Sequence, residues 1–223
     1  MMQKFTTTAP ITAVLNISAG RVQVIAADRS DTTVEVLPAN ASKGRDVKAA
    51  EQTTVEFHDG VVRIVTPAGN QLVGPSGMIE VTVQVPAGSN VEGTAAAAEF
   101  RGVGRLGDIA FDGAYGTIKI DEADRVRLTA LAGDVTVGRL NGSAQITTSK
   151  GDIAIAEAVQ GTVVLRTQAG DVSIGAVAEA SATLDAGTSF GRVQNALKNA
   201  KGTSAELSIE ATTSYGDIDA RSL

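Results

Sequence analysis

Glycine returns in the second half of this chain at an interval that matches one coil of a stacked β architecture, and this repeat constrains the fold most. Successive repeat glycines are separated by 17, 18, 19, 21 and 25 residues. Such a period is too short for the common helical repeats and fits short β-strands that turn and stack. The repeat glycines are Gly116, Gly133, Gly151, Gly170, Gly191 and Gly216.

The residues around these glycines predict a corner in every coil. The aligned segments read TSKGDIAI at 148–155, TQAGDVSI at 167–174, TSFGRV at 188–193 and TSYGDI at 213–218. A positive φ angle costs little only for glycine, and the aspartate that follows it can accept backbone N–H groups at the turn. The predicted structural corner repeat consists of Gly133, Asp134, Gly151, Asp152, Gly170, Asp171, Gly191, Gly216 and Asp217.

The pattern of apolar residues predicts an all-β fold. Apolar and polar residues alternate in short runs, as at 79–85, and a period of two is typical of strands. Only 3% of the residues are aromatic, which favours a narrow core of aliphatic side chains. Coils stacked at about 4.8 Å would enclose a continuous apolar column, so we expect Ile153 and Val172 to point inward.

The change of pattern near residue 95 predicts two regions of one elongated domain. Residues 1–95 read as a more hairpin-like β region, and residues 96–223 as the repeat region. The turns expected before residue 95 lie at 18–20, 27–31, 58–60 and 86–88.

Three segments depart from the strand pattern. Short helices are expected at 45–52 and 193–201, and the glycine- and proline-rich segment 67–77 reads as a mobile loop that joins two strands.

Composition excludes several classes of function. The net charge is -6 with no basic block, so we expect no nucleic-acid partner. The absence of cysteine excludes a disulfide framework and thiolate metal sites. No apolar run approaches the roughly 20 residues of a spanning helix, so membrane insertion is not expected. Residues 1–10 do not resemble a secretory signal, which predicts a cytoplasmic chain, or a surface-exposed one if a leader was removed.

The coil motifs also carry a family resemblance. The Thr-x-x-Gly-Asp-Val/Ile coils, the Gly-Ser/Thr strand entries at 142–143 and 161–162, and the Val-Pro-Ala-Gly-Ser step at 85–89 resemble the bacterial putative-adhesin β-strand repeat family, a domain-of-unknown-function family. The resemblance covers residues 80–223 well and the amino-terminal third loosely. It implies a right-handed, mostly parallel β-solenoid and an adhesin-like role.

The stacked aspartates allow two interpretations. If Asp134, Asp152 and Asp171 occupy equivalent corners, like charges repel by ~1 kcal/mol per pair in water, and hydrogen bonds or a cation such as calcium must offset this. The chain lacks the glycine-rich nonapeptide of calcium-binding β-rolls, and Thr117 and Arg192 interrupt the column. We therefore favour solvated turn carboxylates and predict no metal site and no cofactor.

Aromatic residues precede the corner glycine in three coils. Tyr115, Phe190 and Tyr215 replace the alanine or lysine of the other coils, and the last two lie in successive coils where they could stack. Exposed aromatics on a flat β face suit sugar rings or a partner surface. The alternative is that they shield the carboxy-terminal end of the solenoid.

Catalytic signals are weak in this sequence. His58 is the single histidine and lies in a turn, and the acidic cluster Asp121, Glu122 and Asp124 reads as a loop between strands. We predict no catalytic residues and a non-enzymatic binding, adhesin-like or scaffold module, whose partner is a protein or glycan or further copies joined at the ends or faces of the solenoid. The alternative is a carbohydrate-active solenoid enzyme that uses paired carboxylates.

Overall fold

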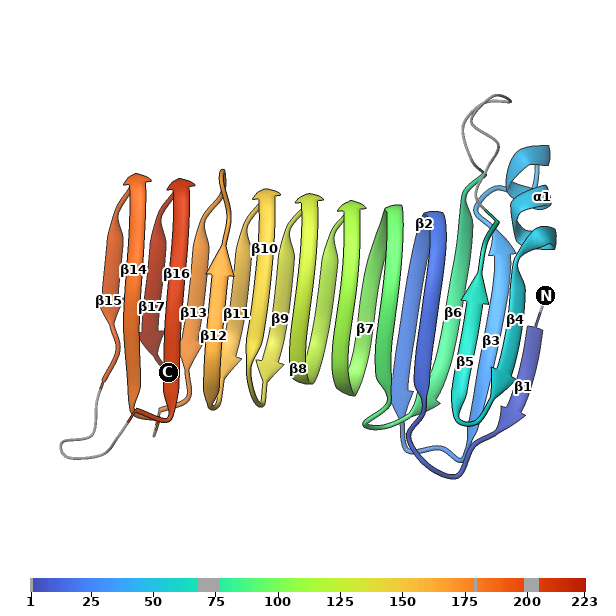
Figure 1. The fold of residues 1–223 in the computed structure, drawn as a ribbon, viewed down its shortest axis with the longest axis horizontal. Coiled ribbons are helices and arrows are strands. Elements are labelled where there is room, and N and C mark those ends of the chain that lie inside the picture. Colours follow the sequence, from blue (N-terminus) through green and yellow to red (C-terminus); the bar gives the residue numbers. More distant parts are fainter. Residues whose placement is uncertain (1, 68–76, 179, 199–204) are drawn as a thin grey trace. The chain divides into compact units, whose positions relative to one another are not determined.

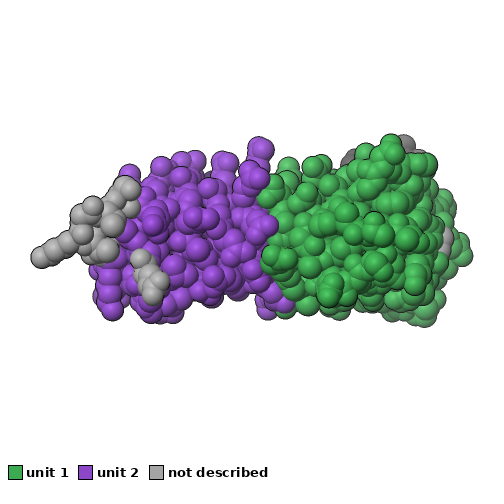
Figure 2. Space-filling view, turned by 90° about the horizontal axis from the view of Figure 1, so that it is seen from below, with its two compact units in different colours: residues 1–116 green, residues 117–223 purple. Residues whose placement is uncertain are grey.

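A computed structural model describes residues 2–67, 77–178, 180–198 and 205–223, and within these ranges the chain is built almost entirely of β-strands (Figure 1). The chain forms two compact units, Met1–Gly116 and Thr117–Leu223, which Figure 2 colours separately. Most strand pairings are parallel, so the predicted all-β, mostly parallel solenoid-like fold is confirmed. The handedness of the coils stays a prediction.

Unit 1 contains a helix as well as strands. Its elements are β1 (Met2–Thr6), β2 (Thr12–Ala27), β3 (Asp31–Pro38), α1 (Gly44–Gln52), β4 (Thr54–His58), β5 (Val61–Val65), β6 (Ile79–Pro86) and β7 (Asn90–Tyr115). In unit 2 the elements formed by the described residues are all strands. They are β8 (Ile118–Ala132), β9 (Val135–Leu140), β10 (Ala144–Lys150), β11 (Ile153–Ala158), β12 (Gly161–Arg166), β13 (Val172–Ala176), β14 (Ala182–Phe190), β15 (Val193–Ala196), β16 (Leu207–Tyr215) and β17 (Ile218–Ser222).

Parallel stacking begins early in unit 1. Strand β2 pairs in parallel with β5 and β6 on one side and with β7 on the other, so β5 and β6 together form one rung of the stack. The turn expected at 18–20 lies inside β2, because Gly20 bends the strand there at a φ of 135° without ending it. The antiparallel pairings among the described strands, β1–β3, β3–β6 and β4–β5, all lie in this unit.

The predicted boundary near residue 95 falls inside the 26-residue strand β7. The compact units divide after Gly116 instead. Compactness does not test independent folding, so the division into domains at 95 stays a prediction. Residues 68–76 of the predicted loop lie outside the described residues.

The outer strands of unit 1 are tied together by side chains. Phe5 of β1 and Phe57 of β4 stack with ring centroids 5.1 Å apart. Helix α1, predicted at 45–52, is confirmed. Its buried Asp46 accepts the Met78 N–H at 3.0 Å, which ties the helix to the start of β6.

The rungs of unit 2 do not follow the order of the sequence. One row of parallel strands runs β8, β10, β12, β16, β14, and the second runs β9, β11, β13, β17, β15. The last two strands of the chain are therefore inserted between two earlier rungs, and β14 with β15 forms the outer rung (Figure 1).

The helix predicted at 193–201 is wrong where the structure describes it. Residues 193–196 form β15, because Val193 follows a corner glycine and pairs with Ile218 of the neighbouring rung. Residues 199–201 lie outside the described part of the chain.

An aliphatic column fills the inside of unit 2. Ile153 is 0% exposed and Val172 is 1% exposed, as predicted for inward positions. The register places Val135, Ile153, Val172 and Ile218 above one another. Each rung therefore depends on its neighbours for a dry surface.

Candidate functional site

The corner glycines of unit 2 leave no space for a side chain beside the neighbouring rung. The φ angles of Gly133, Gly151, Gly170 and Gly216 are between 134° and 152°. A Cβ atom on Gly151 would collide with the carbonyl oxygen of Gly133, and one on Gly170 with that of Gly151. These corners therefore require glycine for both conformation and space.

The corner aspartates form a ladder of hydrogen bonds between rungs. Each carboxylate accepts the N–H of the residue after the glycine in the next rung, at 2.7–3.0 Å. The ladder runs through Asp134, Asp152, Asp171 and Asp217 and ends on the N–H of Arg192. Backbone donors thus counter the repulsion expected between the stacked carboxylates.

Three of the four coil-motif threonines donate to a corner carbonyl of the neighbouring rung, and Thr148 donates to Lys150 of its own coil. The hydroxyl of Thr167 donates to the Gly151 carbonyl at 3.1 Å, and that of Thr213 donates to the Gly170 carbonyl at 3.0 Å. Threonine, glycine and aspartate of the repeat are therefore all used within the fold. Among the residues that the structure describes, no group of three or more His, Cys, Asp or Glu could hold a metal ion.

Unit 1 has a corner column of a different kind, which we call the corner ridge. The register places Ile79, Gly20 and Ala98 at one corner of successive rungs, and Gly116 lies against the Ala98 carbonyl. The residues that follow the first three corners are Glu80, Arg21 and Glu99. The residues that precede the four corners are Met78, Ala19, Ala97 and Tyr115.

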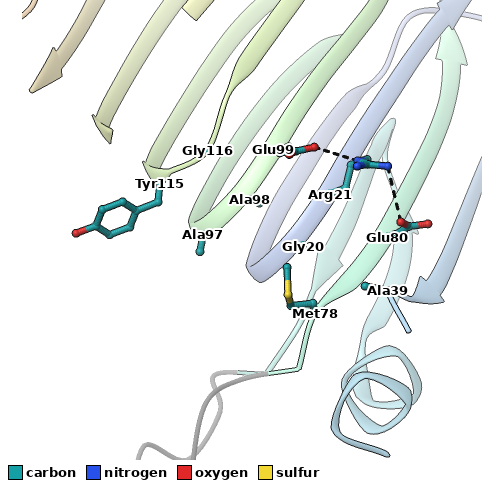
Figure 3. Close-up of a pocket in the computed structure, with 10 residues that line it drawn as sticks. All are labelled: Gly20, Arg21, Ala39, Met78, Glu80, Ala97, Ala98, Glu99, Tyr115 and Gly116. Carbon is teal, nitrogen blue, oxygen red and sulfur yellow. Dashed lines mark hydrogen bonds and ion pairs between the residues drawn. The ribbon is translucent and has the colours of Figure 1, made fainter. Parts of the chain in front are cut away.

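A hollow of about 290 Å³ opens along this ridge (Figure 3). Met78 and Tyr115 precede its outermost corners, and both are large and exposed, at 47% and 59%. The three rung steps between them span about 14 Å at the usual strand spacing. The lining residues of this ridge hollow are Gly20, Arg21, Ala39, Met78, Glu80, Ala97, Ala98, Glu99, Tyr115 and Gly116.

The charges of the ridge hollow alternate in sign. Arg21 Nε lies 3.1 Å from Glu99 Oε2, and Arg21 Nη1 lies 3.8 Å from Glu80 Oε1. All three side chains are about half exposed, so water screens these ion pairs and their contribution to stability is small. They present a guanidinium between two carboxylates along the wall of the hollow (Figure 3).

The three aromatic residues predicted as a binding platform lie in two different parts of the chain. Tyr115 lines the ridge hollow of unit 1. Phe190 and Tyr215 stack on each other in unit 2, with centroids 4.9 Å apart and ring planes 4° apart. Both rings stay exposed, Phe190 at 66% and Tyr215 at 59%, so their role as a binding platform stays a prediction.

The residues suspected of catalysis are not among those that line the ridge hollow. The cluster Asp121, Glu122 and Asp124 lies in β8, so its assignment to a loop was wrong, and Asn141 Nδ2 donates to Glu122 at 2.9 Å and to Asp124 at 3.2 Å. His58 is exposed at the end of β4.

Sequence reasoning missed four residues of the ridge hollow: Arg21, Met78, Glu80 and Glu99. Their corners carry Gly20, Ile79 and Ala98 in place of a Gly-Asp pair, so no repeat marks them. The alternation of charge appears only when residues far apart in sequence are placed in register.

Comparison with known proteins supports the fold. A family model described as Toastrack DUF4097 matches residues 13–222. A search of curated proteins found no match. A solved structure named a "putative adhesin" from Bacteroides fragilis is 11% identical, with a TM-score of 0.58, and the match covers 99% of this chain and 96% of that one. A second, from Parabacteroides distasonis, is 11% identical with a TM-score of 0.50 and coverages of 98% and 96%.

At these identities the likeness concerns the fold alone.

Within the described ranges, the structure contains no helix with the length and hydrophobicity needed to cross a bilayer.

Proposed function

The chain belongs to the Toastrack DUF4097 family, a domain of unknown function, and from this premise we propose that it is a non-enzymatic, adhesin-like module that binds a neutral glycan in the ridge hollow. Two observations carry the proposal: the exposed Tyr115 lines the hollow, and the charges of Glu80, Arg21 and Glu99 alternate along the same ridge. The name adhesin, given to two structures of this fold, agrees with a binding role.

The apolar part of the hollow suits the C–H face of a sugar ring. Tyr115 and Met78 stand at its two ends, and small side chains such as Ala97 lie between them. The volume of about 290 Å³ is near the lower end of ligand pockets, which begin at roughly 300 Å³. A short segment of one or two sugar residues fits this space better than a large ligand.

The charges of the hollow select against charged ligands. An anionic ligand would meet the carboxylates of Glu80 and Glu99, and a cationic ligand would meet the guanidinium of Arg21. A hydroxyl group can donate to a carboxylate and accept from a guanidinium, so a neutral polyhydroxylated ligand satisfies all three. This argument favours neutral sugars over sialylated or sulfated ones.

An array of neutral, sialylated and sulfated oligosaccharides tests the proposal, followed by calorimetric titration with the strongest neutral binder. We expect Tyr115→Ala to weaken this binding about tenfold or more. An aromatic side chain that becomes buried at the centre of an interface on binding typically contributes that much. Ala97→Leu should weaken it as well by filling the hollow.

The matched control is Tyr215→Ala, which removes an equally exposed tyrosine from unit 2 and should leave binding unchanged. Absence of binding to every neutral glycan, or unchanged binding by Tyr115→Ala, would refute the proposal.

A carbohydrate-active enzyme is the second candidate, because two carboxylates flank the hollow. The backbones of Glu80 and Glu99 lie two rungs apart, about 9.6 Å along the stack, and both carboxylates approach Arg21 between them. Inverting glycosidases hold their two carboxyl groups roughly 6.5–9.5 Å apart, with room for water between them. Arg21 pairs with both carboxylates, which opposes a free general acid. If the protein releases new reducing ends from the bound glycan, and Glu99→Gln abolishes this release, the function is hydrolysis rather than binding alone.

A further inference from the structure

The outer rung of unit 2 ends its stack with open strand edges. Strands β14 and β15 form this rung, and in the described part of the chain their pairings are all with β16 and β17 (Figure 1). An open edge offers backbone N–H and C=O groups to another strand.

The inward side chains of this rung are not covered as those of the inner rungs are. Val193 is 44% exposed, whereas Ile218, its partner one rung inside, is 0% exposed. Leu184 is half-buried, and its partner Ile209 is 1% exposed. The aliphatic column of unit 2 therefore opens at this rung.

The edge also lacks the features that protect strand edges in most proteins. Strand β14 contains no proline or lysine and carries one charged residue, Asp185, while β15 carries none. In contrast, the outer strand β1 of unit 1 carries Lys4, and its Phe5 stacks on β4. Charged residues and proline on an edge oppose pairing with other chains, so β14 is poorly defended against it.

A glycine in β14 has no explanation within the chain's own fold. Gly187 is not in the left-handed region of φ, and a Cβ there would meet no described atom within 4 Å. The residue beside it one rung inside is Thr212, and the next is Arg166. Glycine weakens a strand because it has no side chain to pack, and it leaves space on the outward sheet face for a side chain of another strand.

We propose that two copies of this chain join through the outer rung, with β14 of one copy pairing antiparallel to β14 of the other about a two-fold axis at Ala186. This register pairs the strand from 183 to 189 and keeps inward residues opposite inward residues. It places Asp185 opposite Gly187 of the second copy. A register centred on Asp185 would set like charges opposite each other.

The pairing covers the inward side chains of β14 in both copies. Leu184 lies opposite Thr188 of the second copy, and Ala186 lies opposite itself. The two-fold axis makes each contact twice, which is the usual arrangement of a homodimer. The interaction belongs to unit 2 and does not depend on the glycan site proposed for unit 1.

Analytical ultracentrifugation of the full chain over a wide concentration range tests the proposal, with opposite charges introduced at one position. Gly187→Asp sets a negative charge against Asp185 of the second copy in two places, and we expect it to weaken dimerisation about tenfold. Gly187→Lys sets a positive charge there, and we expect dimerisation to tighten several-fold. Both side chains have open space, so the fold should tolerate them.

The same substitutions at Gln145 are the matched control. Gln145 is exposed on β10, three rungs inside the edge, so Gln145→Asp and Gln145→Lys should leave dimerisation unchanged. A monomer at every concentration would overturn the proposal, and so would a shift in the same direction by both Gly187 variants. Because the readout is association, a failure of glycan binding would not affect it.

Discussion

The corner column of unit 2 and the corner ridge of unit 1 are built from the same kind of rung and do different things. In unit 2, the residue after each corner is mostly aspartate, and its carboxylate accepts a backbone N–H of the next rung. In unit 1, the equivalent positions hold Glu80, Arg21 and Glu99, which bind one another. The first arrangement joins backbone to side chain, and the second leaves charged groups facing solvent.

The difference shows how a repeat protein can gain a site. Unit 2 uses each motif residue to hold rungs together, so its corner surface carries few uncommitted groups. Unit 1 tolerates Ala98 at a corner and places small residues between Met78 and Tyr115, which opens the ridge hollow. A local loss of the repeat therefore opens a hollow at a modest cost in regularity.

The comparison is sharpest at the corners themselves, where one residue type is required in unit 2 and replaced in unit 1. Gly151→Ala should destabilise the protein by about 3 kcal/mol, because the φ of 134° is strained for alanine and its Cβ would collide with Gly133. Ala98→Gly should cost only about 0.5–1 kcal/mol, from the added freedom of the unfolded chain. Urea unfolding followed by circular dichroism measures both.

Gly187→Ala is the control for the glycine substitution itself, since no described atom lies near its Cβ position and its φ is ordinary. Equal losses for Gly151→Ala and Gly187→Ala would contradict the claim that close rung contact, rather than glycine content, defines the corners of unit 2.

The next effect concerns the ladder that follows those corners. Asp152→Ala should lower stability by about 1–2 kcal/mol, because the N–H of Asp171 loses its acceptor. Asp152→Asn keeps the acceptor and should stay within about 0.5 kcal/mol of the native protein, since Asn90 accepts the Asp108 N–H at 2.8 Å in unit 1. Unfolding in urea at neutral pH gives both values.

Glu99→Gln tests the other half of the comparison at an equivalent position. Its ion pair with Arg21 is exposed, so the loss should be less than about 1 kcal/mol. If Glu99→Gln lowered the free energy of unfolding more than Asp152→Ala does, our assignment would be reversed. The corner ridge of unit 1 would then have the structural role that we assign to the corner aspartates of unit 2.

The part of this molecule that the sequence predicts best is the part with a local, repeated cause. Glycine recurring every 17–25 residues, mostly followed by aspartate, indicated the coils and their inward residues, because the φ angle at a corner depends on the residue placed there. Strand Val193–Ala196 was missed because its conformation depends on Ile218, 25 residues further along the chain. Pairing with a distant strand decides the conformation of these residues, and it overrides their weak local preference for a helix.

The candidate site was predicted only through Tyr115, which the coil alignment marks as an aromatic before a corner glycine. Its neighbours Met78 and Arg21 come from other rungs, and no local pattern connects them. The place of β16 and β17 between two earlier rungs was not predicted either. The corner motif is nearly the same in every coil, so it does not indicate the order in which the rungs stack. Which rung lies beside which is decided by long-range packing.

The smallest effect that separates the two units is a dependence on pH in unit 1. Hydrogen bonds from Arg29 and Lys4 lower the pKa of Asp31 from 3.8 to about 2, so its ionised form is favoured by folding. This contribution is present above pH 4 and is lost as the pH falls toward 2. Because Lys4 lies on β1 and Asp31 on β3, acid should loosen the outer strands of unit 1 before it affects the aliphatic column of unit 2. Urea unfolding of the native chain and Asp31→Asn at pH 4.5 and 2.5 measures the effect: the native chain should lose more stability between the two values. Equal losses would mean that Asp31 does not join these strands in solution.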